Sequence, residues 1–296
     1  FNNSLPWTFN TSVTANVLAT QMFRYATAFN QDIGSWNTNR FTNTASMFDG
    51  ALVFNQDISG WNTDSVVDAS YMFQGATAFN SPLSSWFTTG SLSNTSPVGG
   101  GVVGMFQGAT AFNGLVSQWN TSNLTSLYQT FKDATSFNQS LNLWDVSNVT
   151  IFSDTFIGAT SFTGIGLPGW NTSSALNFSG MFNGASAFNQ TLSRWDISNV
   201  VSASDMLTGT AISQLNWDSL LNGWAAQAPN IQNGVTLSTI SVIHSAGQPT
   251  ASYDKLTSSP YNWTITDLGA ALPPPPFEFT IDTTATEAGS SANNQY

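Results

Sequence analysis

The stretch Met181–Met206, MFNGASAFNQTLSRWDISNVVSASDM, contains one unit of a repeat that runs through most of the chain. A Met-Phe pair, a Gly-Ala step, a Phe-Asn segment and a Trp follow one another in this order. Successive copies are mostly 25 or 26 residues apart. A period of this length is typical of stacked coils, in which each unit buries its apolar face only against its neighbours.

Three aromatic positions recur once in each unit. One Phe precedes the Asn, a Trp ends the segment that follows, and a second Phe usually comes after Met. We expect all three to form the core, although a row of Trp could also stack against sugars. The positions are Phe1, Phe29, Phe54, Phe79, Phe112, Phe137, Phe162 and Phe188; Trp7, Trp36, Trp61, Trp86, Trp119, Trp144, Trp170 and Trp195; and Phe23, Phe48, Phe73, Phe106, Phe131, Phe156 and Phe182, with Leu207 in the eighth place.

The pattern within a unit predicts its local structure. The Phe-Asn-Gln-x-Ile/Leu-x-x-Trp segment is too short for a helix, and its alternation favours a short strand paired in parallel with its copies. Met-Phe-x-Gly-Ala predicts a single helical turn that glycine ends. Because parallel crossovers are almost always right-handed, we expect an α/β repeat fold: a right-handed solenoid of about eight short parallel strands.

An Asn follows the first Phe in every unit except one, where Thr163 replaces it. Such a row could contact a ligand. We expect instead an inward ladder, because amide side chains can pair the backbone groups that a tight bend leaves free. The row consists of Asn2, Asn30, Asn55, Asn80, Asn113, Asn138 and Asn189.

The repeat ends near residue 208, and residues 209–268 are expected to form an α/β cap over the last coil. Apolar residues at helical spacing predict a helix over Leu215–Gln227. A strand over Val235–Ile243, a helix over Pro249–Thr257 and a strand over Asn262–Thr266 should follow. A Gly-rich insertion before Phe106 lacks the Lys of a phosphate-binding loop and is expected to lie at the surface.

Composition excludes several classes of function. Charged residues make up 7% of the chain, with sixteen acidic and five basic residues and a net charge of -11. Without a basic patch, nucleic acid is not an expected partner. No apolar run is long enough for membrane insertion, and the absence of cysteine excludes disulfides and thiolate metal sites. The chain starts inside a repeat and without Met, so we expect a trimmed product.

Taken together, these phrases resemble the BspA-like surface-protein repeats of about 25 residues found in Mycoplasma lipoproteins and bacterial surface proteins, which are relatives of leucine-rich repeats. The family phrase is nearly intact in Met72–Phe79 and in Trp144–Thr150, and the cap matches through Leu220–Gln227 and Asn262–Asp267. The resemblance covers about residues 1–268. It implies an LRR-like fold and an extracellular or cell-surface location, and it supplies no catalytic residues.

The segment 269–296 lies beyond this resemblance. A polyproline run, Pro273–Pro276, should form a stiff spacer. After it, Phe277, Phe279 and Ile281 alternate with Glu278, Thr280 and Asp282, which predicts a half-buried strand without a sheet of its own. The strand could fold back on its own cap, or it could dock on a neighbouring copy.

We therefore hypothesise a structural subunit of an extracellular filament or surface assembly. The tail strand of one copy would cover the open N-terminal end of the next, at Phe1, Leu5 and Trp7, in a head-to-tail homopolymer. A cell-surface adhesin or glycan- or protein-binding module is the alternative; the strand face or residues 87–104 would then contact the ligand.

Catalysis is the weakest interpretation of the sequence. His244 is the only histidine, and no nucleophile motif lies near it. The acidic residues Asp32, Asp57, Asp145 and Asp196 recur at turn positions without the density of a calcium site. We expect no enzyme activity, no metal and no cofactor.

Asn-x-Ser/Thr sequences make covalent N-glycans conceivable if the source is a eukaryote. The Asn-x-Ser/Thr sequences on the expected inward ladder are excluded as glycan sites, because a glycan would not fit there. Loop sites after the Trp, at Asn120, Asn123, Asn148 and Asn171, are the better candidates. The full set is Asn10, Asn94, Asn120, Asn123, Asn148, Asn171, Asn177 and Asn262.

Overall fold

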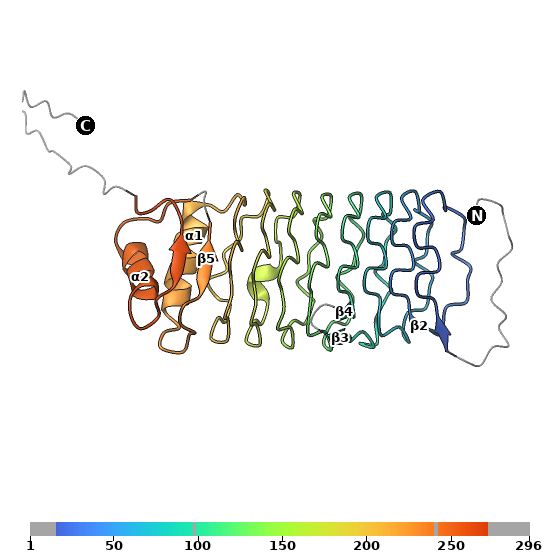
Figure 1. Ribbon diagram of the computed structural model, residues 1–296, viewed down its shortest axis with the longest axis horizontal. Helices are drawn as coiled ribbons and strands as arrows, with labels where there is room; N and C mark the ends of the chain where they lie inside the picture. The colour runs from blue at the N-terminus through green and yellow to red at the C-terminus, as the bar shows by residue number, and fades with distance from the viewer. Residues whose placement is uncertain (1–15, 97–98, 240–241, 272–296) are drawn as a thin grey trace, which may run out of the picture.

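The computed structural model describes residues 16–96, 99–239 and 242–271. The chain winds into a row of stacked coils, and the two α-helices lie together at the C-terminal end of the row (Figure 1). The elements are β1 (Val17–Leu18), β2 (Phe41–Asn43), β3 (Asn94–Ser96), β4 (Gly99–Gly100), a 3-10 turn (Leu167–Gly169), α1 (Gln214–Ala225), β5 (Thr236–Ser238), α2 (Gln248–Thr257) and β6 (Thr264–Thr266). The right-handed, LRR-like classification and the domain limits 1–208, 209–268 and 269–296 stay predictions.

The Met-Phe segments form tight turns and not the expected helical turns. In the second coil, Phe48 N donates to Met72 O and Ser46 N donates to Ser70 O of the next coil, while Asp49 N bonds to Ser46 O within its own coil. Inter-coil and local bonds therefore alternate along the segment. A helix cannot form here, because it would need every one of these N–H groups for its own bonds. We call this series of inter-coil bonds the turn ladder.

Parallel pairing occurs after the Trp and not between the Phe and the Trp, where we expected it. β1 pairs in parallel with β2, and the later coils are joined by single bridges such as Ser126↔Ile151 and Ile151↔Asn177. The Phe-to-Trp segment bends before it can extend as a strand, since Trp61 N bonds back to Ile58 O. The long unit adds the antiparallel hairpin β3–β4.

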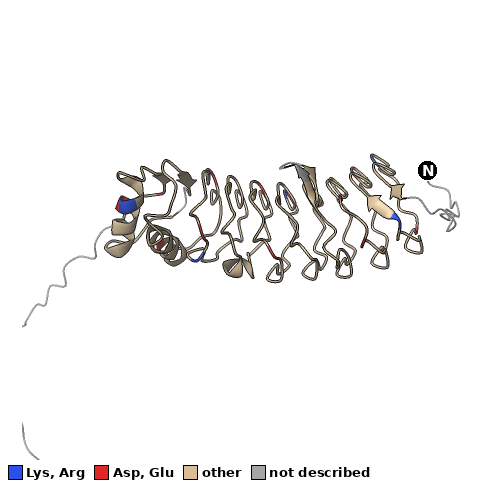
Figure 2. Ribbon diagram, turned by 90° about the horizontal axis from the view of Figure 1, so that it is seen from below, with Lys and Arg blue, Asp and Glu red and all other residues tan. Residues whose placement is uncertain are grey.

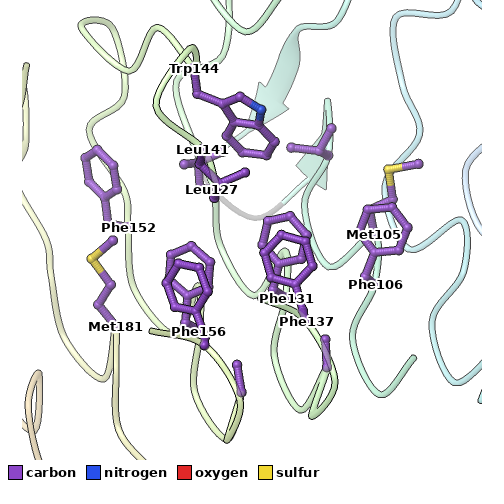
Figure 3. Packing of buried hydrophobic residues seen from close by; sticks show 14 of the residues in the cluster. Met105, Phe106, Leu127, Phe131, Phe137, Leu141, Trp144, Phe152, Phe156 and Met181 are labelled. Carbon is purple, nitrogen blue, oxygen red and sulfur yellow. The ribbon is translucent and has the colours of Figure 1, made fainter. Parts of the chain in front are cut away.

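Aromatic rings fill the interior, as the ladders predicted. Within each coil the two Phe rings stack with centroids 3.8 to 4.0 Å apart. Between coils the rings of the Met-Phe row are 5.4 to 5.7 Å apart. Figure 3 shows Phe131, Phe137 and Phe156 in this core. Burying each ring stabilises the fold by roughly 1.5–3 kcal/mol, so coils hold together mainly through contact with their neighbours.

The tryptophans are also interior, so a sugar-stacking row is wrong for the described part of the chain. The indoles from Trp36 to Trp195 are at most 7% exposed. From Trp61 to Trp195, each indole N–H donates to a carbonyl of the preceding coil; Trp61 Nε1, for example, donates to Ile33 O at 3.0 Å. The pattern reaches the cap, where Trp224 of α1 donates to Leu192 O.

The Asn ladder faces outward, which corrects our expectation of an inward row. Each described Asn of the row is exposed, because it follows a buried Phe and neighbouring side chains of an extended segment point to opposite sides. The ladder still pairs backbone groups: Asn80 Oδ1 accepts from Asn113 N at 2.7 Å. The same bond recurs from Asn30 to Asn138.

The cap elements follow the predicted order. β5 continues the turn ladder, since Ala203 N donates to Thr236 O, and β6 pairs in parallel with β5. α1 lies against the Trp side of the last coil, where a side chain at Gly223 would meet Ser193 O. Helix, sheet and repeat core are therefore continuous at this end.

Candidate assembly surface

The predicted assembly residues lie outside the described residues. This holds for the tail strand Phe277–Asp282 and for the acceptor residues Phe1, Leu5 and Trp7. What the structure does describe is the coil next to that acceptor, Val17–Tyr25, and the cap next to that tail. These two ends of the stack differ in their hydrogen bonding.

The N-terminal end of the turn ladder presents carbonyl groups. Every coil donates its ladder N–H groups toward the C-terminal end, as in Phe23 N to Met47 O and Tyr25 N to Asp49 O. The carbonyls of a coil therefore point toward the N-terminal end. Within residues 16–96, 99–239 and 242–271, no backbone N–H donates to Thr20 O, Met22 O or Arg24 O, the equivalents of Ala45 O, Met47 O and Asp49 O in the first described coil.

The C-terminal end of the same ladder is covered. α2 packs on the outer side of β6, where the Tyr253 hydroxyl donates to Ile265 O at 3.2 Å. Trp263 N donates to Leu256 O of α2. Side chains and a helix thus occupy the last edge. Among the described residues, the two ends of the ladder differ: the first coil has acceptors without a backbone donor, and the last edge is covered.

Four exposed apolar side chains lie in the first two described coils, next to the acceptors without a backbone donor. Met22 is 39% exposed, Tyr25 65%, Leu52 43% and Val53 46%. We call these four residues the coil-end patch. Tyr25 and Leu52 belong to adjoining coils, and the Tyr25 ring lies directly over Gly50. The patch is therefore continuous across two coils.

Arg24 holds the Tyr25 ring of the patch in place. Its Nε donates to Asp49 Oδ2 at 2.8 Å and its Nη2 to the Tyr25 hydroxyl at 2.9 Å. The guanidinium carbon lies 4.7 Å from the centre of the Tyr25 ring. The hydrogen bond to Asp49 raises the pKa of Arg24 above its usual value. A fixed aromatic ring of this kind loses little side-chain entropy when a partner covers it.

Charged groups elsewhere are few and scattered along the coils (Figure 2). In the described ranges, no three His, Cys, Asp or Glu residues lie close enough to hold a metal ion. None of the helices in these ranges has the length and apolarity needed to cross a bilayer.

His244 lies in the cap and is 3% exposed. Its Nδ1 is 2.8 Å from Asp267 Oδ2, which also accepts from Trp217 Nε1 at 2.9 Å. The imidazole stacks on Tyr253 with ring centres 4.7 Å apart. These contacts tie β6 to α1 and α2, so the group stabilises the cap.

A surface hollow of about 520 Å³ near the cap is shared by the last coil and α1. Its lining is Ser193, Leu215, Asp218, Ser219, Asn222 and Gly223. Asp218 accepts from Ser245 N at 2.9 Å and so serves the chain itself.

The glycan candidates differ in what their side-chain nitrogen does. Asn94 Nδ2 donates to Gly100 O and to Ser126 O, so a glycan there would replace two structural bonds. Asn123 and Asn148 each donate one such bond, and Asn262 donates to Pro260 O. In Asn120, Asn171 and Asn177 the side-chain oxygen instead accepts a hydrogen bond from a backbone N–H in a turn. Asn10 lies outside the described residues.

The family model that matches this chain covers most of its length, in three segments: residues 2–98, 91–166 and 165–233. The chain belongs to the DUF285 family. That family is described as "Mycoplasma protein of unknown function". No curated protein and no solved structure matches. Membership in DUF285 agrees with a Mycoplasma-type repeat protein, while the finer likeness to BspA-like leucine-rich repeats stays a prediction.

Proposed function

We propose that this protein is a structural subunit of an extracellular filament or surface assembly, in which the tail of one copy docks on the N-terminal end of the next. The observation that carries the proposal is the directional polarity of the turn ladder, whose two ends differ. Thr20 O, Met22 O and Arg24 O face the N-terminal end without a donor among the described residues, while Tyr253 and α2 cover the other end.

This polarity favours strand addition over direct end-to-end stacking. Two stacks cannot simply extend each other's ladder, because α2 stands in the way at one end. A strand carried on a spacer can reach the acceptors, and each new backbone hydrogen bond would contribute about 0.5–1.5 kcal/mol. Head-to-tail contacts of this type repeat into filaments unless the rotation closes a ring.

The apolar side of the tail would add to these bonds. Burial of Phe277, Phe279 and Ile281 provides roughly 1.5–3 kcal/mol for each side chain, and the ordering of the tail opposes part of that gain. Further contact between the ends of two stacks is therefore expected in a stable filament.

The test compares the full chain with a variant that lacks residues 273–296, by negative-stain microscopy and light scattering. We expect the deletion to abolish polymers. A variant that lacks only residues 284–296 is the matched control, since it keeps Phe277–Asp282 and should still assemble. Filaments of unchanged stability after the longer deletion, or a wild-type chain that stays monomeric at all concentrations, would reject the proposal; a monomer would favour an adhesin.

A further inference from the structure

Two departures from the repeat create the coil-end patch. At the corner before the first Phe, the other units carry a hydroxyl residue and then a small residue, as in Thr77-Ala78 and Thr160-Ser161. The second coil has Leu52-Val53 at these positions. Both are nearly half exposed, so the substitution places apolar surface in water and not in the core.

The stack itself does not need these two side chains. At the equivalent corners the hydroxyls link coils: Thr77 Oγ1 donates to Leu52 O at 3.2 Å, and Thr160 Oγ1 to Thr135 O at 3.4 Å. Leu52 cannot donate such a bond, so its coil gives up one inter-coil contact. An exposed apolar pair that replaces a stabilising hydroxyl is more simply explained by a partner than by folding.

Tyr25 is a second departure from the repeat. Its position in the turn ladder has a positive φ, which is 56° for Tyr25. Glycine occupies it in most other coils, including Gly75, Gly158 and Gly184. A bulky side chain in this backbone region is strained, yet the ring is 65% exposed. A strained residue with an exposed ring again indicates a contact with another molecule.

We propose that the coil-end patch is the docking surface for the tail strand Phe277–Asp282 of a second copy; this inference rests on the proposed function. The patch adjoins the carbonyls of Thr20, Met22 and Arg24, so one strand can use both. The apolar residues of that strand would then cover Tyr25, Leu52 and Val53. Arg24, whose side chain is 37% exposed, supplies a cation beside the acidic residues of the strand.

The reach of the tail favours a second copy over the same chain. The patch and the last described residues lie at opposite ends of the stack (Figure 1). Seven coil-to-coil steps separate Phe23 from Leu207, which at ~4.8 Å each amounts to roughly 34 Å. The six residues from Ala271 to Phe277 span at most about 21 Å. A tail that starts at the cap therefore meets the patch of a neighbour before its own.

The experiment restores the repeat at the patch. L52T/V53A gives the second coil the Thr-Ala corner of its neighbours, and Y25G gives the first described coil the ladder glycine. Both variants should therefore fold with an unchanged or higher melting temperature. We expect each to raise the concentration at which the full chain assembles at least tenfold. The matched control T160L/S161V places the same apolar pair in the middle of the stack, and it should leave that concentration unchanged.

A second measurement separates this inference from the proposed function. A fluorescent peptide of residues 273–286 should bind the full-length wild-type chain and bind L52T/V53A at least tenfold more weakly, by anisotropy. If deletion of residues 273–296 abolishes assembly while L52T/V53A and Y25G leave it unchanged, the patch is rejected and the proposed function stands. A peptide that binds all variants equally, or does not bind the wild type, also overturns the inference.

Discussion

The ring of Tyr71 lies over the backbone of Gly104, its equivalent in the next coil. Both have a positive φ, 57° for Tyr71 and 58° for Gly104, and a Cβ on Gly104 would overlap the Tyr71 ring. The same relationship links Asp154 to Gly180. Tyr71 and Asp154 therefore each depend on the glycine of the coil that follows, although the same row also holds consecutive side chains such as Gln129 and Asp154.

Gly104→Ala tests whether the Tyr71 ring requires glycine at position 104. The variant adds a side chain both to a left-handed backbone and to a space that Tyr71 fills, so we expect the free energy of unfolding to fall by about 2–4 kcal/mol. Urea unfolding followed by circular dichroism measures the change. Y71S should restore part of the stability of G104A, because it removes the overlap and leaves the backbone strain.

Gly169→Ala is the matched control for that prediction. No atom lies within 4 Å of the position that its Cβ would take, and its backbone needs no left-handed conformation. We expect a change of less than about 0.5 kcal/mol. Equal losses for G104A and G169A would show that the overlap with Tyr71 does not matter.

Asn80→Ala tests the exposed asparagine ladder. The variant removes the acceptor of Asn113 N, and the loss of one hydrogen bond should lower the free energy of unfolding by about 0.5–1.5 kcal/mol. Asn80→Asp keeps an acceptor oxygen at the same place and should retain most of the stability. If N80A and N80D unfold at the same urea concentration, the side-chain bond contributes nothing.

How far the sequence predicts this structure depends on the kind of residue. The Phe and Trp rows were predicted correctly as core, because large aromatic side chains at a constant period have no better place than the interior. The helix at α1 was predicted from its apolar stripe, and it runs over Gln214–Ala225. In both cases the hydrophobic pattern alone decides the outcome.

The backbone of the repeat was harder to predict. The Met-Phe segment has the spacing of a helical turn, but its N–H groups pair with the neighbouring coil, and a single sequence contains no sign of that register. The Asn row was wrongly placed inside, although its position next to a buried Phe indicates an outward side chain.

The coil-end patch did leave a signal in the sequence. Leu52-Val53 breaks the corner of a hydroxyl residue and a small residue that the other units keep, and Tyr25 takes a position of glycine. Only the structure shows that these residues adjoin and that they lie beside the acceptor end of the ladder. Departures from a repeat are thus worth examining as contact residues.

The acid dependence of stability should reflect the turn at Asp145. Hydrogen bonds from the Ser147 hydroxyl and from Ser147 N lower the pKa of the Asp145 carboxyl. A lowered folded-state pKa contributes stability above the unfolded-state pKa of about 3.9, and this contribution is lost as the pH falls through the folded value. Asp145 is exposed, so solvent screening should keep the effect below about 0.5 kcal/mol.

Two variants check this assignment. S147A removes the larger of the two causes, so an NMR titration should show the pKa of Asp145 rising toward its usual value. D145N keeps an acceptor oxygen, as Asn171 does at the equivalent turn. Its free energy of unfolding should therefore be slightly below that of the wild type at neutral pH and equal to it in acid. If the pKa of Asp145 is the same in S147A and in the wild type, the hydroxyl is not the cause.

Asp267→Ala should loosen the cap. Asp267 accepts from Trp217 Nε1 and pairs with His244 Nδ1 through one oxygen, and it accepts from Gly269 N through the other. The variant leaves these buried groups without a partner, so we expect a loss of about 2–5 kcal/mol in the free energy of unfolding, measured by urea titration. Asp254→Ala, an exposed acidic residue of α2, is the control and should change it by less than about 0.5 kcal/mol.

Because α2 covers the last edge of the ladder, D267A should also speed amide exchange in β6 while the central coils keep their protection. Uniformly faster exchange along the whole stack would instead mean that cap and coils unfold as one unit.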